Sequence, residues 1–237
     1  MKIISALFSL LFSTAIFSQE KIVVDPAAQS RTLSGSFTAI DITDGIELVL
    51  SQGATESIAV STGDEKYIDQ FKTEVENGVL KIYFDNKGIN WSDNSRRKLR
   101  AYVSFKMIDK LTAAGGADVK LREITADELD MKFTSGATFN GKVHAKEITV
   151  DQNSGSMMNM SGSADKFKVE ASSGAIFKGY ELAAEFCEAK ASSGASVRIS
   201  VQKELSARAS SGGGIHYKGS AMIKDIDISS GGIVKKS

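Results

Sequence analysis

Hydrophobic and polar residues alternate along most of the chain, and from Leu111 onward this alternation recurs at a nearly constant interval. Each repeat centres on a Ser-Gly pair, whose glycines are 18 to 20 residues apart: Gly136, Gly155, Gly174, Gly194, Gly212 and Gly231. A degenerate earlier copy centres on Gly116. Apolar residues recur seven, five and three positions before the glycine and three positions after it, with Gln152 and Lys224 as exceptions. Apolar positions two residues apart are typical of strands with one buried face.

A constant period of this kind predicts units that stack on one another. We therefore expect an all-β fold, a parallel β-solenoid or β-helix with coils of about 19 residues. Each coil should hold two short strands, one on each side of the Ser-Gly corner, and a second turn near Gly141, Gly162, Gly179 and Gly219. Glycine suits the corner because it reaches backbone angles that a Cβ obstructs. Serine hydroxyls aligned in this way are able to hydrogen-bond along the stack.

Residues 36–110 show less regular alternation, which predicts N-terminal strands and a hairpin of the same domain. Turn signals at Asp44-Gly45 and Gln52-Gly53 divide residues 36–62 into two or three strands. Asn77-Gly78 predicts a hairpin. Residues 64–75 fit either a short helix or a loop that leads into a strand. Residues 85–98 are polar and are expected to form an exposed excursion.

Residues 1–18 have the pattern of a secretory signal peptide: Lys2, an apolar run from Ile3 to Phe17, and then Ser18. The alternative is a membrane anchor, but the run is shorter than the ~20 residues that a spanning helix needs. We expect an exported protein, in the periplasm, at the outer surface or secreted, with no membrane span after cleavage. Residues 19–35 would then be an extended N-terminal lead, and residues 111–237 the regular solenoid.

The composition of the chain argues against several kinds of binding and catalytic site. The 29 basic and 29 acidic residues balance, so the charge gives no reason to expect a nucleic-acid partner. Cys187 is the only cysteine, which excludes an internal disulfide, and it falls on an inner column as a small apolar residue. Together with only two histidines, it argues against a zinc site. Gly136 to Lys142 has the spacing of a phosphate-binding loop, but Val143 stands where Ser or Thr is required. We expect no cofactor, no metal and no catalytic residues.

The Ser-Gly-Ala series, the Gly-Gly-Ala-Asp of residues 115–118, and the segments at 45–50 and 78–82 together resemble a known bacterial family. It is the auto-transporter adhesin, head GIN domain family, common in Bacteroidetes, and the likeness covers roughly residues 37–220. The resemblance implies a pectin-lyase-like β-helix without catalytic residues and a role in cell-surface adhesion. It supplies no functional residues.

These observations favour an exported, non-enzymatic adhesion or interaction module in which weak contacts repeat along a flat face. The column two residues after each glycine should face outward, and it contains Met157 and Ile176. These two are candidate binding residues, as are Trp91, Arg96 and Arg97 in the polar excursion. The expected partner is a protein or glycan at the cell surface, with a homo-oligomer through the coil ends or a flat face as a further possibility.

Two other functions remain open at this stage. One is a structural or sensory protein of the periplasm or cell envelope. The other is a polysaccharide-acting β-helix enzyme, which would need carboxylates or basic residues that converge on one face over adjacent coils. The outward charges of this chain alternate in sign instead, as in Lys168 and Glu170.

Overall fold

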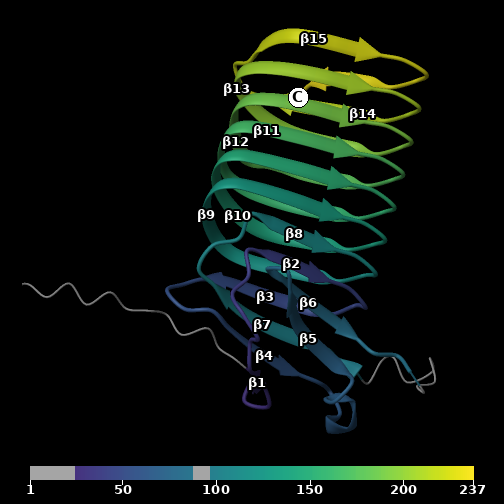
Figure 1. Cartoon of the computed structure of the whole chain (residues 1–237). Helices are drawn as coiled ribbons and strands as arrows, with labels where there is room; N and C mark the ends of the chain where they lie inside the picture. Colours follow the sequence, from purple (N-terminus) through teal and green to yellow (C-terminus); the bar gives the residue numbers. More distant parts are fainter. Residues whose placement is uncertain (1–24, 88–96) are drawn as a thin grey trace, which may run out of the picture.

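The computed structural model describes residues 25–87 and 97–237, and these residues wind into one parallel β-solenoid (Figure 1). The predicted fold class is therefore confirmed. The predicted signal peptide, residues 1–18, lies outside the described residues. In the described ranges no helix is both long and apolar enough to span a membrane.

Five long strands form the middle of the solenoid and pair in parallel with their neighbours: β9 (Asp118–Phe133), β10 (Thr138–Gln152), β11 (Met157–Ala171), β12 (Ile176–Ala191) and β13 (Ser196–Ala209). Each coil has the two predicted arms, but its second turn is a bend inside one strand, so hydrogen bonding continues around it. Glycine is needed at this bend, since a Cβ on Gly162 would lie 2.0 Å from the Val143 carbonyl oxygen.

The Ser-Gly corners are tight turns of the type I′ kind, because both central residues have positive φ. The serines have φ between 46° and 54° and the glycines between 71° and 75°. Within one corner, the Ala175 amide donates to the Ser172 carbonyl at 3.1 Å, and between coils the Gly174 amide donates to the Ser193 carbonyl at 3.1 Å. Within the described corners, backbone groups rather than serine hydroxyls connect successive coils, which corrects the hydroxyl ladder expected from the sequence.

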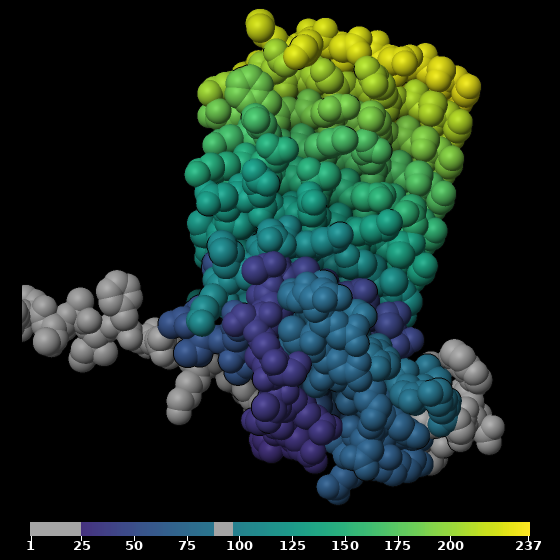
Figure 2. All heavy atoms as spheres, in the orientation of Figure 1, coloured from purple at the N-terminus to yellow at the C-terminus, as the bar shows by residue number. Residues whose placement is uncertain are grey.

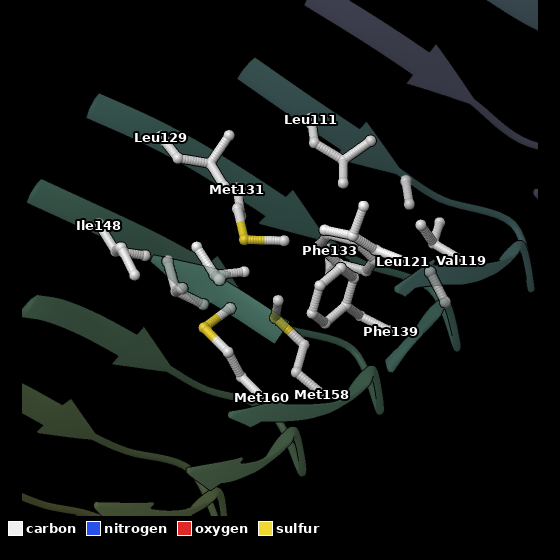
Figure 3. Close-up of a cluster of buried hydrophobic side chains, with 14 of the residues drawn as sticks. Leu111, Val119, Leu121, Leu129, Met131, Phe133, Phe139, Ile148, Met158 and Met160 are labelled. Carbon is white, nitrogen blue, oxygen red and sulfur yellow. The ribbon is translucent and has the colours of Figure 1, made fainter. Parts of the chain in front are cut away.

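The predicted apolar columns form the core between the two arms (Figure 3). Phe133 and Phe139, three residues before and after Gly136, pack with ring centroids 5.7 Å apart. The position directly after each corner glycine also points inward, which the sequence reading did not include: Ala137, Ser156, Ala175 and Ala195 are buried. Gln152, one of the two exceptions, is fully buried despite its amide.

Lys224, the other exception, does not occupy the inner column. The last coil comprises β14 (Gly214–Lys218), β15 (Met222–Ile228) and β16 (Ile233–Lys236). A register shift in β13 against β15 places Ile223 beside Leu205. Lys224 therefore faces solvent and its Nζ lies 2.9 Å from Glu204 Oε1. The inner apolar column therefore continues through Ile223. The sequence analysis placed Lys224 in this column, one residue too far along the chain, because counting back a fixed number of residues from the glycine cannot detect a β-bulge.

Residues 36–110 contribute to the solenoid itself. Their elements are β2 (Ala39–Ile42), β3 (Glu47–Gln52), β4 (Ser57–Ser61), the 3-10 turn η1 (Glu65–Tyr67), β5 (Phe71–Glu76), β6 (Val79–Phe84), β7 (Arg100–Phe105) and β8 (Lys110–Ala113). The strands and the hairpin expected here are present, and residues 64–75 combine a short helical turn with a strand. In the N-terminal lead, β1 (Gln29–Arg31) pairs with β4.

The spatial order of the first coils differs from their order in the sequence. β2 and β3 meet at the Asp44-Gly45 corner, and the Gly45 amide donates to the Gly115 carbonyl at 2.9 Å in the same corner column. On one side this coil pairs with β8 and β9, and on the other with β6 and β7. Along the chain, β2 and β3 come first but form the second coil of the stack. β6 and β7 follow and form the outermost coil, and β8 and β9 then form the third coil, on the other side of β2 and β3.

Antiparallel strands close the N-terminal end of the solenoid. β4 pairs with β7 and β5 pairs with β6, both antiparallel, outside the first coil. Tyr67 and Phe71 are buried beneath them, and the Tyr67 ring packs edge-on against Phe84 at 6.1 Å. Figure 2 shows these N-terminal strands gathered at one end of the column and the last residues at the opposite end.

Candidate binding face

The outward side chains that follow the corners form a continuous surface, which we call the ladder face. It consists of two columns, two and four residues after each corner glycine. The first column is Asp118, Thr138, Met157, Ile176, Ser196, Gly214 and Ile233, and the second is Lys120, Asn140, Asn159, Lys178, Arg198, His216 and Lys235. Parallel register places each residue directly beside its equivalent in the next coil, about 4.8 Å away.

Met157 and Ile176 are adjacent in the first column, as the sequence predicted. Met157 is 39% exposed and Ile176 is half-buried. The next two residues in the column, Ser196 and Gly214, are small, and Ile233 follows. The column therefore offers exposed apolar surface on both sides of a flat, small-residue stretch.

The second column carries a run of basic residues over four coils. Lys178, Arg198, His216 and Lys235 are successive register partners. Across the described residues, Lys178, Arg198 and Lys235 have no carboxylate within 4.0 Å. Like charges on neighbouring strands repel one another, and no carboxylate of the described residues offsets this repulsion with an ion pair. The sequence reading missed this run, although the fixed offset of four from each glycine would have found it.

A tyrosine and a further lysine lie beside the basic run. The Lys218 ammonium is 4.3 Å from the centroid of the Tyr180 ring, and the Tyr180 hydroxyl lies 2.8 Å from the Ser237 hydroxyl. Lys218 also has no carboxylate partner among the residues that the structure describes. The C-terminal half of the ladder face thus gathers cations and an aromatic ring in one area.

The outward surface that precedes the corners has a different character, and we call it the paired face. Several of its cations contact carboxylates on the same or the next coil: Lys190 Nζ lies 2.8 Å from Glu170 Oε1, and Arg208 Nη2 lies 3.7 Å from Asp225 Oδ2. The hydrogen bond from Lys190 lowers the pKa of Glu170, although partial burial opposes this, and Lys168 adds to the effect. Glu170 therefore stays ionised near neutral pH.

A shallow groove of about 440 Å³ runs across the paired face between the corner serines and the charged column. Its lining includes Glu170, Lys190 and Arg208. A general acid would need a carboxyl with a raised pKa, whereas the pKa of Glu170 is lowered. The groove consequently has the features of a solvated, ion-paired surface.

Arg97 is not an exposed binding residue, in contrast to the sequence prediction. It is only 5% exposed, its Nη1 donates to Asn86 Oδ1 at 2.8 Å, and its guanidinium lies 5.0 Å from the centroid of the Phe84 ring. It anchors the end of the polar excursion to the core instead. The other two candidates in that excursion, Trp91 and Arg96, lie outside the described residues.

Cys187 and Lys142, which the sequence analysis also considered, both have structural surroundings that explain them. Cys187 is buried, and this burial raises the pKa of its thiol. Lys142, the lysine of the phosphate-loop-like segment, pairs with Glu123 at 3.1 Å. Within residues 25–87 and 97–237, no three His, Cys, Asp or Glu side chains are grouped so that they could hold a metal ion.

Residues 36–221 match the family described as "Putative auto-transporter adhesin, head GIN domain". The chain belongs to this family. No curated protein matches the chain.

Solved structures resemble this fold over almost its whole length. A protein named as a putative adhesin from Bacteroides fragilis has a TM-score of 0.79 and 16% identity, covering 89% of this chain and 96% of its own. One from Parabacteroides merdae, also so named, has a TM-score of 0.63 and 18% identity, covering 90% and 97%. A putative lipid binding protein from Parabacteroides distasonis has a TM-score of 0.63 and 20% identity, covering 88% and 95%. At these identities the likeness establishes the shared fold alone.

Proposed function

We propose that this family member is an exported, non-enzymatic adhesion module whose ladder face binds an acidic polysaccharide at a cell surface. The observation that carries the proposal is the run of Lys178, Arg198 and Lys235, which have no carboxylate partner among the described residues, while Lys190, Arg208 and Lys224 before the corners each have one. A stack that only needed a solvated surface would gain nothing from like charges in line.

A linear polyanion suits this geometry because the cations stand in one row along the solenoid axis. Each contact would be a weak, exposed ionic interaction, but several contacts on one polymer add up through effective concentration. The exposed side chains of Met157 and Ile233 and the half-buried side chain of Ile176 would contact the less polar faces of the sugar rings. Because the contacts are exposed, binding should weaken as salt screens the charges.

The leader-like residues 1–18 and the family support export. The lowered pKa of Glu170 and its ion pairs support a binding role over polysaccharide cleavage, since an ionised carboxylate held by two lysines is poorly suited to donate a proton. Cell fractionation tests the location: retention of the whole pool inside the periplasm would overturn the surface role and favour a structural or sensory envelope protein.

The binding test compares two variants that each lose three positive charges. One is Lys178→Ser/Arg198→Ser/Lys218→Ser at the basic run of the ladder face and the lysine beside it, and the matched control is Lys132→Ser/Lys168→Ser/Lys224→Ser, whose lysines sit in ion pairs. The probes are immobilised polygalacturonate and heparin, with neutral dextran as a blank. We expect the first variant to bind about tenfold or more weakly, as three exposed ionic contacts would predict, and the control to bind like the wild type.

Three results would count against the proposal. An equal loss of polysaccharide affinity in both variants would mean that binding depends on net charge and not on the ladder face. Binding to polyglutamate but to neither polysaccharide would point to an acidic protein instead. Release of reducing ends from polygalacturonate would contradict the non-enzymatic role.

A further inference from the structure

The C-terminal end of the solenoid carries an uncovered apolar surface. Of the eight large hydrophobic side chains that are exposed in the described residues, five lie in the last coil: Met222, Ile223, Ile226, Ile228 and Ile233. Ile223, Ile226 and Ile228 continue the inner column of Leu205, Ala207 and Ala209, all of which are buried. They are 40% to 49% exposed because no described strand lies beyond them.

The same end also presents an open backbone edge. β15 pairs only with β13, and β16 pairs only with β14, among the strands that the structure describes. The outer edges of both strands therefore offer unpaired amides and carbonyls, a template for pairing with another chain. At the opposite end, the described strands β1 and β5 each pair with one strand too, but Tyr67 and Phe71 beneath them are buried, so the open edge and the exposed apolar surface coincide only at the C-terminal end.

We propose that this end docks onto the same end of a second copy of the chain, forming a two-fold dimer. Exposed apolar surface at one end only favours an isologous contact, because a head-to-tail contact would have to use the N-terminal end, where Tyr67 and Phe71 are buried, and would propagate into a filament. The proposal does not depend on polysaccharide binding: in the dimer Lys235 pairs with the partner subunit, and Lys178, Arg198 and Lys218 stay available to a polymer.

Charge complementarity selects one of the two ways in which the ends can face each other. β15 carries Asp225 and Asp227 on its outer side, and β16 carries Lys235. A two-fold axis that passes through the corner lays β15 antiparallel on the partner's β16. Asp227 and Lys235 are four residues before and after Gly231, so this arrangement brings each Asp227 opposite Lys235 of the partner subunit. Laying β15 on β15 would instead gather four carboxylates.

Asp227 and Lys235 are available for this contact. Neither has an oppositely charged partner within 4.0 Å among the described residues, whereas Asp225 is already paired with Arg208 at 3.7 Å. In the proposed arrangement, Ile228 packs against Val234 of the partner subunit, and the two antiparallel edges can exchange backbone hydrogen bonds.

The test is the mass in solution of the exported chain, residues 19–237, measured by size-exclusion chromatography with light scattering over a range of concentrations. The wild type should have twice the protomer mass. Ile226→Asp/Ile228→Asp should be monomeric, because the carboxylates would be buried unpaired in the interface. Both positions are exposed in the protomer, so circular dichroism should stay unchanged. Met107→Asp, at another exposed apolar site, is the control and should remain a dimer.

The charge pair gives a second, independent readout. Asp227→Lys and Lys235→Glu should each shift the equilibrium toward monomer, because like charges then oppose each other. An equimolar mixture of these two single variants should form heterodimers, since both contacts across the two-fold axis become complementary again. A wild type that is monomeric at every concentration would overturn the proposal, as would a dimer that none of these substitutions weakens.

Discussion

Inside the solenoid, the Gln152 Nε2 group donates a hydrogen bond to Ser156 Oγ at 3.4 Å, and both side chains are fully buried. The amide also contacts the Ile176 carbonyl at 3.4 Å, but Gln152 Oε1 has no partner. Neighbouring coils have Phe133 and Ala171 in the position of Gln152, and Ala137 and Ala175 in that of Ser156. One coil thus holds an incompletely satisfied polar pair where its neighbours are apolar.

Replacing both members of this pair should stabilise the protein. Gln152→Leu/Ser156→Ala removes a buried oxygen that lacks a partner, and this should raise the free energy of unfolding by about 1–3 kcal/mol. Ser156→Ala alone should destabilise, because the amide loses a hydrogen-bond acceptor and keeps its unpaired oxygen. Urea unfolding followed by circular dichroism measures both. A double variant less stable than the wild type would show that the pair supports the fold.

The two kinds of glycine should respond differently to alanine. Gly174 sits at a corner with φ of +73°, and a Cβ added there would meet no atom within 4 Å, so Gly174→Ala should cost only the backbone conformational term, about 1–2 kcal/mol. Gly162→Ala should cost more, because its Cβ would lie 2.0 Å from the Val143 carbonyl oxygen. Thermal unfolding ranks the two variants, and equal losses would contradict the distinction between corner and bend.

Asparagine should be accepted in place of the corner serine. Ser173 has φ of 52°, a region that asparagine adopts more readily than most residues. Its backbone carbonyl accepts the hydrogen bond from the Gly155 amide at 3.1 Å and is retained in Ser173→Asn. We therefore expect a melting temperature equal to or above that of the wild type. A clearly lower melting temperature would mean that the Ser173 hydroxyl stabilises the stacked coils.

Cys187 should be inert in the folded protein. Its side chain lies in the inner column beside Phe167 and Leu205, and burial raises the pKa of the thiol. Because the thiolate is the reactive species, a disulfide reagent such as Ellman's reagent should react only after unfolding. The measurement is the rate of colour release with and without urea. Fast reaction in the native protein would contradict the buried position.

Glu47 should contribute to the acid sensitivity of the fold. It accepts hydrogen bonds from Lys120 at 2.6 Å and Arg100 at 2.8 Å, which join the three coils of β7, β3 and β9. The hydrogen bond from Lys120 is the main cause that lowers the pKa of Glu47, partial burial opposes it, and Arg100 adds to the lowering. Because the folded pKa is below the unfolded one, the stabilisation is present above the ordinary value of 4.5 and is lost as pH falls through the folded value.

Glu47→Gln should therefore lower stability at neutral pH by less than about 1 kcal/mol, because the cations are largely exposed. The difference from the wild type should shrink as the pH is lowered through the carboxyl range. Urea unfolding at several pH values measures it. A difference that stays constant at low pH would mean that Glu47 acts through packing and not through its charge.

Where the interactions were local, the sequence reading was accurate. The Ser-Gly corners, the Asn77-Gly78 hairpin and the inner columns depend on backbone angles and side-chain alternation within a few residues, and all are present. The sequence reading failed where a one-residue register shift changed which side chain points inward, as at Lys224. It also failed where the burial of a side chain depended on a segment distant from it in the sequence. Arg97 is such a case, since its neighbours Asn86 and Phe84 precede a polar stretch that gave no sign of a buried arginine.

By itself, the sequence determined the architecture: a period of about 19 residues, with apolar positions two apart, is compatible with parallel coils that share one core. Only the tertiary structure decided the order of the first coils, the closure of one end, and the exposure of Ile226 and Ile228 at the other. The reason is physical. A repeat specifies which face of each strand points inward, but whether that face is buried depends on what stacks beyond it. The same holds for charge, since the isolation of Lys178, Arg198 and Lys235 becomes visible only when the coils are laid side by side.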